Sequence, residues 1–320
     1  MDKRRLGRTG YVVAPLAFGG NVFGWTADEP TSFALLDAFV AGGGNLIDTA
    51  DSYSRWAPGH AGGESETVIG RWIARRGRHD DVVIATKVGS DMGLGYKCLR
   101  RDYVLKAAED SLRRLGVEAI DLYQSHWDDE NTAFDETLEA YALLMKQGKV
   151  RAIGASNLSA ERLASALAAS DRTGLPRYAT LQPHYNLYER QSFEGPLSDL
   201  CIREGLGVIP YFALASGFLT GKYRSDADFG KSQRGGGMHK FLNPRGLRIL
   251  AALDAVAARY GATPAQVALA WLMARPGVTA PIASATSVAQ LDALLAATRI
   301  VLDGDAQRAL DVASAPAQSA

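Results

Sequence analysis

The chain has 320 residues, and its 35 Lys and Arg residues balance 35 Asp and Glu residues, so the formal net charge is zero. This balance argues against nucleic acid or an anionic membrane as the main partner, because both require concentrated positive charge. Two cysteines are too few for a disulfide scaffold or a thiolate metal site. The first five residues, 1–5, are not followed by an apolar stretch of signal-peptide length, and no run reaches the roughly 18 apolar residues of a membrane span. We therefore expect a globular protein of the cytoplasm that binds neither nucleic acid nor a membrane.

Short runs rich in β-branched residues alternate with longer amphipathic stretches, as is typical of parallel α/β folds. Strands are predicted over residues 16–19, 45–48, 82–87, 119–125, 150–155, 179–182, 207–211 and 279–283. Helices are predicted over residues 31–41, 65–76, 101–115, 131–146, 159–170, 197–204, 263–274 and 287–297. Eight strand–helix units in a chain of this length favour a (β/α)8 TIM barrel over an open doubly wound sheet, which usually has fewer strands.

Two segments lie outside this repeating pattern. Residues 5–13 contain a turn bounded by glycines, which indicates an N-terminal hairpin that closes the bottom of the barrel. After the seventh predicted strand, residues 219–247 form a long, polar and Gly-rich loop, which is typical of a functional lid or of disorder. No linker rich in proline or serine divides the chain, so we predict a single barrel domain over residues 1–320.

Polar residues able to do chemistry follow successive predicted strands. Asp48 ends the second strand and is soon followed by Tyr53, Lys87 ends the third, and His126 follows the fourth. Asp48 has an ordinary explanation as a turn cap, and His126 has one as a packing residue. Lys87 is harder to explain in this way, because a lysine that ends a buried apolar strand needs a partner or a route to water. Since barrel active sites lie at the carboxyl ends of the strands, the four residues together predict a catalytic site.

Several common chemistries lack their sequence patterns. No Gly-x-Gly-x-x-Gly follows a strand, and there is no Walker loop, His-Glu-x-x-His or Cys-x-x-Cys. The five histidines lie on separate predicted elements without the spacing of metal ligands, so no metal site is expected.

The motifs around these residues resemble the aldo-keto reductase superfamily. The resemblance rests on Asp-Thr-Ala-Asp-Ser-Tyr at 48–53, Ala-Thr-Lys at 85–87, Ser-His at 125–126, Ile-Gly-Ala-Ser-Asn at 153–157, Leu-Gln-Pro-His-Tyr-Asn at 181–186 and Gly-Phe-Leu-Thr-Gly-Lys-Tyr at 217–223. These motifs follow the family's order over nearly the whole chain. The resemblance implies a (β/α)8 barrel that binds NADPH without a Rossmann motif and carries a catalytic tetrad of Asp48, Tyr53, Lys87 and His126.

The chemistry of these four side chains suits the reduction of a carbonyl group. Tyr53 is the candidate acid, but free tyrosine has a pKa of about 10 and holds its proton tightly. The ammonium of Lys87 favours phenolate and improves proton donation, and Asp48 pairs with Lys87 and fixes its position. His126 can donate a hydrogen bond to the substrate oxygen. The resemblance implies the same roles.

The resemblance also implies which residues bind the cofactor. Ser156, Asn157 and Gln182 match positions that hydrogen-bond the nicotinamide carboxamide, and Tyr211 matches the residue that stacks on the nicotinamide ring. The remaining matches line the pyrophosphate and the adenosine, and they are Leu214, Ser216, Gly217, Leu219, Lys222, Ala283, Ser284, Ala285, Thr286 and Gln290.

Cofactor preference is where the chain departs from the family. Gln290 stands where an Arg often binds the 2′-phosphate, and residues 284–292 contain no basic residue, which favours NADH. The loop after the seventh strand, however, is rich in Lys and Arg, among them Lys222, Arg234 and Lys240. We predict that this loop folds over the dinucleotide and that NADPH is preferred, with NADH as the alternative.

Three tryptophans follow predicted strands one, two and four, and they predict an apolar aromatic substrate pocket of Trp25, Trp56 and Trp127. Such a pocket suits a small aldehyde or ketone. We expect the protein to be a monomer or a weak homo-oligomer. The sequence leaves two alternative hypotheses. One is a redox-sensing regulatory subunit of the potassium-channel β type. The other is a barrel hydrolase or isomerase, for which no metal cluster or carboxylate pair is found.

Overall fold

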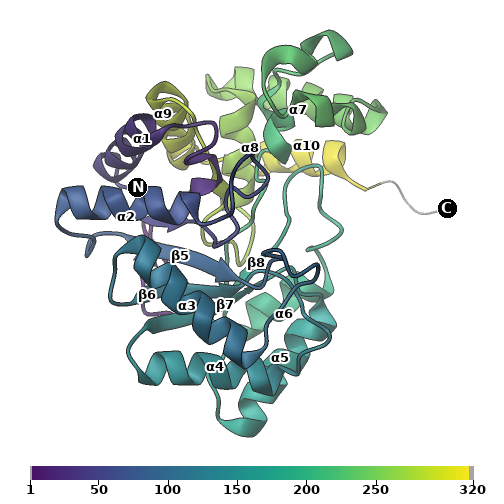
Figure 1. The fold of residues 1–320 in the computed structure, drawn as a ribbon. Helices are drawn as coiled ribbons and strands as arrows, with labels where there is room; N and C mark the ends of the chain where they lie inside the picture. Colours follow the sequence, from purple (N-terminus) through teal and green to yellow (C-terminus); the bar gives the residue numbers. More distant parts are fainter. Residues whose placement is uncertain (1, 317–320) are drawn as a thin grey trace.

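Eight parallel strands form the centre of the protein in the computed structural model, which describes residues 2–316 (Figure 1). They are β3 (Ala17–Gly19), β4 (Leu46–Asp48), β5 (Val83–Val88), β6 (Ile120–Ser125), β7 (Val150–Ser156), β8 (Thr180–Gln182), β9 (Gly207–Val208) and β10 (Ile282–Ala283). From β3 to β9 each strand pairs with the next, and β10 pairs with β3. A bridge between Val208 and Val278, and a hydrogen bond from the Ile282 N–H to the Pro210 carbonyl at 2.8 Å, close the ring. The predicted (β/α)8 barrel is confirmed.

Helices surround the strands (Figure 1). The eight that follow the strands are α1 (Glu29–Ala41), α2 (Glu64–Arg76), α3 (Arg101–Leu115), α4 (Phe134–Lys146), α5 (Ala160–Thr173), α6 (Pro196–Glu204), α8 (Pro264–Met273) and α9 (Val288–Ala296). Short 3₁₀ turns lie at η1 (Gly20–Val22), η2 (Ala215–Thr220), η3 (Asp226–Lys231), η4 (Gly235–Lys240) and η5 (Ala297–Arg299). Two further helices, α7 (Pro244–Tyr260) and α10 (Gly304–Ser314), pack against each other, and the sequence patterns did not predict them.

The predicted N-terminal hairpin is present as β1 (Arg4–Arg5) paired antiparallel with β2 (Val12–Val13). Leu6 and Val13 are fully buried and pack with the apolar side chains that fill the barrel. Gly7 lies between them with φ +52°, and a Cβ there would stand 2.1 Å from the Ala179 carbonyl oxygen. Because only glycine fits so close an approach, the turn sequence directly determines how the hairpin closes the barrel.

The long loop after β9 is folded rather than open. Its turns η3 and η4 pack against each other, and Met238 on η4 is 1% exposed. At its end, Asn243 caps α7 by accepting a hydrogen bond from the Gly246 N–H, and Pro244 occupies the first turn. The loop expected over residues 219–247 therefore ends in the first turn of an additional helix.

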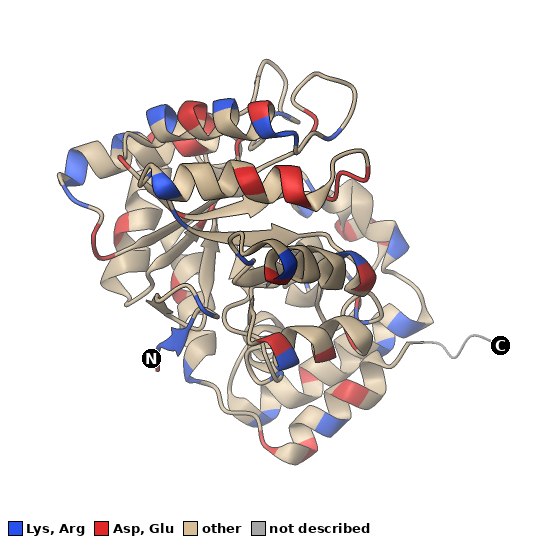
Figure 2. Cartoon of the chain, turned by 90° about the horizontal axis from the view of Figure 1, so that it is seen from below, with Lys and Arg blue, Asp and Glu red and all other residues tan. Residues whose placement is uncertain are grey.

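Charged side chains of both signs are mixed over the outer helices, while the strands carry few of them (Figure 2). Many of these charges pair across neighbouring helices, as Arg71 does with Glu29 and Arg172 does with Asp135. Within residues 2–316, none of the helices is both long enough and apolar enough to span a membrane.

Trp72 on α2 and Trp271 on α8 are both fully buried in the apolar core. Each indole N–H has a carboxylate partner at 2.8 Å, Asp37 for Trp72 and Asp311 for Trp271. The polar end of each ring is thereby satisfied, as a buried tryptophan requires.

Candidate active site

A buried lysine connects two consecutive strand ends. Lys87 on β5 is fully buried, and its Nζ donates to Asp48 Oδ2 at the end of β4 at 2.8 Å. The same nitrogen donates to the Thr49 carbonyl oxygen at 2.7 Å and lies 3.2 Å from the Tyr53 hydroxyl. Although burial lowers the pKa of Lys87, Asp48 and Tyr53 raise it, and the balance lies above the ordinary value. Lys87 is therefore a fixed ammonium between a carboxylate and a phenol.

Tyr53 lies in the segment between β4 and α2, where its ring faces both Lys87 and His126. Burial raises the pKa of Tyr53, and the Lys87 ammonium opposes that rise. The net pKa lies above the ordinary value of 10.0, so the expected effect of Lys87 is present but burial outweighs it. The phenol is accordingly protonated at neutral pH, as a proton donor must be.

His126 follows β6 and lies beside Tyr53, with ring centroids 5.9 Å apart. Its backbone is held by two neighbours, since its N–H donates to the Val88 carbonyl at 2.8 Å and its carbonyl accepts from Asn157 Nδ2 at 2.9 Å. Burial, helped by the ammonium groups of Lys87 and Lys97, holds the pKa of His126 well below its ordinary value. The ring is therefore neutral at physiological pH.

The predicted amide residues lie beside these groups at the ends of β7 and β8. Gln182 Nε2 donates to Asp48 Oδ1 at 2.8 Å, so each oxygen of that carboxylate has its own donor. Ser156 Oγ donates to the Gln182 carbonyl at 2.8 Å, and Asn157 Nδ2 also contacts Ser156 Oγ at 3.0 Å. The hydrogen bond from Gln182 to Asp48 was not anticipated, because no sequence spacing links residues on strands so far apart.

Tyr211 lies just beyond β9 with its hydroxyl donating to Asn157 Oδ1 at 2.7 Å. One face of its ring stacks on His184, with centroids 5.2 Å apart and planes 18° from parallel. His184 belongs to the Leu-Gln-Pro-His-Tyr-Asn motif at 181–186, and the sequence predicted no role for it. The structure shows that it backs the aromatic ring expected beside the nicotinamide.

The residues expected around the pyrophosphate and adenosine lie in two short segments. Ala215 and Ser216 have φ of +48° and +57°, so the chain turns sharply at the start of η2. At the other segment, Thr286 and Gln290 are exposed at the N-terminus of α9, where Gln290 Oε1 accepts from the Thr286 N–H at 2.9 Å. A helix N-terminus attracts anions, so this segment can receive a phosphate without a basic side chain.

These groups fit a nicotinamide dinucleotide. Gln182 Oε1 accepts no hydrogen bond from any described residue, and it stands free for an amide donor such as the carboxamide. Tyr211 supplies an aromatic ring, and α9 supplies an exposed helix N-terminus for a phosphate. The site therefore contains an acceptor for an amide group, an aromatic surface for a planar ring and a helix N-terminus for an anion.

The three predicted pocket tryptophans lie on both sides of Tyr53. Trp56 contacts the Tyr53 ring at 5.5 Å between centroids and Trp25 at 5.7 Å, and it is half exposed. Trp127 stacks on His126 at 5.8 Å. The aromatic walls therefore stand beside the phenol and the imidazole that we expect to contact a substrate.

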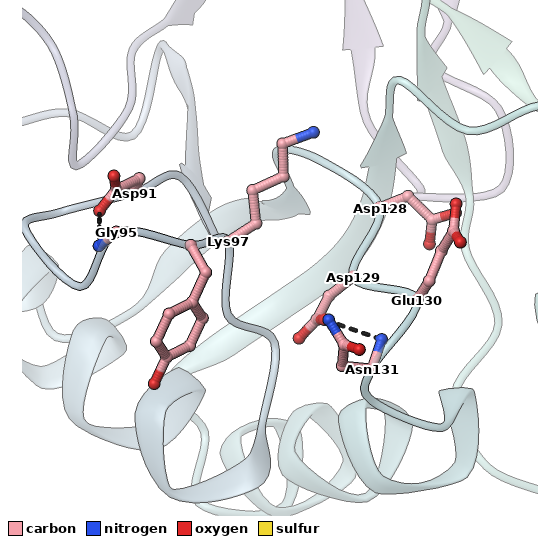
Figure 3. A pocket seen from close by; sticks show the side chains of 8 residues that line it. Asp91, Gly95, Lys97, Asp128, Asp129, Glu130 and Asn131 are labelled. Atoms are coloured by element: carbon pink, nitrogen blue, oxygen red, sulfur yellow. Dashed lines mark hydrogen bonds between the residues drawn. The ribbon is translucent and has the colours of Figure 1, made fainter.

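A cavity of about 400 Å³ lies between the loops that follow β5 and β6 (Figure 3). It is lined by Asp91, Gly95, Tyr96, Lys97, Asp128, Asp129, Glu130 and Asn131. Lys97 lines this cavity and also contacts Trp127, since its Nζ lies 4.4 Å from the centroid of the Trp127 ring. Two of the carboxylates that line the cavity already have partners. Asp128 pairs with Arg162, and Asp129 accepts hydrogen bonds from the Leu99 and Asn131 N–H groups. Within the described residues, no group of three or more His, Cys, Asp and Glu is arranged to hold a metal.

Comparison with known proteins shows which family and which relatives the chain is similar to. The model of the aldo/keto reductase family matches residues 15–314. Protein tas of Escherichia coli (strain K12) is 32% identical over 330 residues, which cover 95% of each chain. Aldo-keto reductase YhdN of Bacillus subtilis (strain 168) is 34% identical over 298 residues, covering 91% of this chain and 86% of that one. A probable voltage-gated potassium channel subunit beta of Arabidopsis thaliana is 31% identical over 318 residues, covering 95% of each.

Proposed function

The chain belongs to the aldo/keto reductase family, and from this premise we propose that it reduces an aldehyde or ketone to an alcohol with a nicotinamide cofactor. The observation that supports the proposal best is the environment of Lys87 Nζ, which touches Asp48, the Thr49 carbonyl and the Tyr53 hydroxyl within 3.2 Å. A fixed ammonium beside a protonated phenol is what a general acid for a carbonyl oxygen requires.

When bound, a reduced nicotinamide supplies the hydride that a carbonyl carbon accepts. Tyr53 donates its hydroxyl proton to the carbonyl oxygen, which prevents an alkoxide from forming. The positive charge of Lys87 stabilises the phenolate that remains, while Asp48 and the Thr49 carbonyl keep the ammonium in place. His126 donates an N–H to the same oxygen and orients the carbonyl between the aromatic walls.

NADPH is the cofactor that we propose, with Ser156, Asn157, Gln182 and Tyr211 at the nicotinamide. Arg234 on the long loop is half-buried and lies over the Trp25 ring at 5.6 Å. With the Asn21 amide turned so that its nitrogen donates to Ser284 Oγ, its oxygen accepts from Arg234 at 2.6 Å. No carboxylate among residues 2–316 pairs with this guanidinium, so its charge is available to a phosphate of the cofactor.

The substitution Tyr53→Phe tests the proposed function. It removes the acid and leaves the ring, so cofactor binding is retained while carbonyl reduction falls by about 10²–10⁴-fold. The measurement is the loss of NADPH absorbance with a panel of aldehydes and ketones, alongside cofactor titration of both proteins. Turnover like that of the wild type in the variant would remove Tyr53 from the mechanism.

A regulatory role is the second candidate, and the similarity to the probable channel subunit of Arabidopsis thaliana supports it. A redox-sensing subunit would bind the cofactor tightly yet turn over poorly with every carbonyl compound in the same panel. We further propose that the protein acts in the cytoplasm as a monomer or a weak homo-oligomer, with a small carbonyl compound as its partner.

A further inference from the structure

Ser90 lies two residues beyond β5 and beside His126, although no sequence pattern singled it out. Its hydroxyl oxygen is 2.9 Å from Nδ1 of the His126 ring, and the residue is 8% exposed. The two residues come from neighbouring strand ends that are already joined, because the His126 N–H donates to the Val88 carbonyl at 2.8 Å. Strand pairing therefore holds the serine against the imidazole.

The hydrogen bond has a preferred direction. Ser90 Oγ has no other hydrogen-bond partner among residues 2–316. If Nδ1 donated to it, the serine proton would be left without an acceptor inside the protein, which is unfavourable for a nearly buried hydroxyl. The serine therefore donates and Nδ1 accepts. A neutral imidazole has a single N–H, so its proton must then lie on Nε2.

The charged and titratable groups around the ring agree with a neutral histidine. The ammonium groups of Lys87 on β5 and of Lys97 in the following loop lie near the ring. Their positive charges disfavour a protonated imidazole, so both lower the pKa of His126. Tyr53 presents its ring at 5.9 Å. Among the described residues no carboxylate hydrogen-bonds to the imidazole, and Nε2 has no partner at all. That nitrogen is free for a ligand.

We propose that Ser90 is a positioning residue that holds neutral His126 in the Nε2–H tautomer, so that this N–H is presented to the carbonyl oxygen of the substrate. The role rests on the proposed reduction, to which His126 contributes the oxygen donor. A second histidine provides an internal comparison, since His60 Nδ1 lies 3.0 Å from Ser54 Oγ in a similar pair that Ser90 does not touch.

The direct test is the ¹⁵N NMR spectrum of the histidine rings in the wild type and in Ser90→Ala. In the wild type the shifts of His126 should identify Nε2 as the protonated nitrogen. In the variant Nδ1 loses its donor, so the shifts of both ring nitrogens should move towards a mixture of tautomers while those of His60 stay unchanged. A proton on Nδ1 in the wild type, or identical His126 shifts in both proteins, would overturn the proposal.

Kinetics provide the second readout. Losing one neutral hydrogen bond should lower kcat of Ser90→Ala by about 3- to 10-fold while the Kd for NADPH stays the same. Ser90→Thr keeps the hydroxyl and should restore both kcat and the wild-type ¹⁵N shifts. An unchanged kcat in Ser90→Ala would show that the serine does not position His126 for the reaction.

The NMR measurement needs no substrate, so the two proposals can fail separately. If no carbonyl compound is reduced by the wild type while the tautomer still depends on Ser90, the proposed function is wrong and the effect of Ser90 on the ring stands. If the wild type reduces a carbonyl compound and the His126 tautomer is the same with and without the Ser90 hydroxyl, only the role proposed for Ser90 is wrong.

Discussion

Lys87 carries a fully buried charge whose partners are a carboxylate, a backbone carbonyl and a phenol. A buried cation of this kind is maintained only by its partners, because removing one member of a buried pair leaves the other charge uncompensated. The interaction therefore contributes to folding and to chemistry through the same atoms. Substitutions at Lys87 and at Asp48 test the chemical contribution through kcat.

Lys87→Met removes the ammonium that favours the Tyr53 phenolate. We expect the pKa of Tyr53 to rise further, because burial would then act without opposition. The alkaline limb of the reduction rate, where Tyr53 loses its proton, should move to higher pH, and the maximal kcat should fall by about 10²-fold or more. The measurement is kcat against pH for both proteins.

Asp48→Asn is the matched comparison, since it keeps the shape of the carboxylate and leaves the Lys87 amino group beside the Thr49 carbonyl and the Tyr53 hydroxyl. It should lower kcat less than Lys87→Met does, because Asp48 orients the ammonium and transfers no proton. If Lys87→Met left the pH profile where it was, the electrostatic coupling between Lys87 and Tyr53 would be wrong.

Asp51 is a buried carboxyl group that the proposed reaction does not use. Its exposure is 3%, and its Oδ1 has no hydrogen-bond partner among residues 2–316. Burial, followed by the Glu66 carboxylate, raises the pKa of Asp51 to about 8. Folding therefore favours the protonated acid. The stability contributed by that proton is complete below the unfolded pKa of about 4 and is lost as the pH rises through 8.

Asp51→Asn should remove this dependence, because the amide stays neutral at every pH. We expect the variant to have a higher Tm than the wild type at pH 9 and a similar Tm at pH 5. Thermal unfolding followed by circular dichroism at both values is sufficient. A Tm difference that is the same at the two pH values would mean that Asp51 is already ionised in the folded protein near neutrality.

The sequence predicted these residues unevenly. Asp48, Lys87 and His126 stand at strand ends, where the barrel rule places functional side chains, and the structure brings them together around Tyr53. Ser90 and the bond from Gln182 to Asp48 could not be predicted. They depend on which side chains meet across the barrel, and a single chain read in order carries no such distances.

At the level of elements, all eight strands were predicted because their apolar runs are bounded by turn residues. The helices α7 and α10 were missed. The start of α7 lies directly after the Gly-rich loop, whose polar composition hid the change of pattern at Asn243 and Pro244. Helix α10 does place Ala306, Leu310 and Ala313 on one buried face at helical spacing, but two of these three residues are alanines, which give a weak apolar signal.

Asp311 on α10 ties that helix to α8. Its carboxylate accepts from Trp271 Nε1 at 2.8 Å and from Arg275 at 3.0 Å. Asp311→Ala would leave a buried indole N–H without a partner, so we expect a loss of about 1–3 kcal/mol in the free energy of unfolding. Urea unfolding measures it. Asp292→Ala, an exposed change on α9, should cost almost nothing, and an equal loss in both variants would refute the role of Asp311.

Across the whole molecule, pairing of β10 with β3 brings the first and the last strand of the barrel together, and the long loop after β9 reaches the same place through Arg234. Arg234 from that loop meets Trp25 and, through Asn21, Ser284. Segments more than 200 residues apart in the chain thus lie at one side of the candidate site. That one domain spans residues 1–320 stays a prediction, as does the binding of a cofactor beneath the loop.

This arrangement predicts how cofactor preference responds to salt. Because the formal net charge is zero, no overall attraction favours the more negative NADPH, and a preference must come from local cations. We expect NADPH to be preferred over NADH in kcat/KM at low ionic strength and the preference to weaken as salt screens the partly exposed Arg234. Arg234→Ala should reduce the preference by about 10-fold, as expected for a charged hydrogen bond.

Lys240→Ala is the control for this prediction. The Lys240 ammonium lies 4.9 Å from the Phe241 ring centroid, and its carbonyl accepts from the Tyr188 hydroxyl, so it is held in a different part of the loop. This variant should keep the wild-type preference. If Arg234→Ala weakened both cofactors equally, the guanidinium would contact the pyrophosphate that they share. Equal use of NADH by the wild type at low salt would contradict the preference itself.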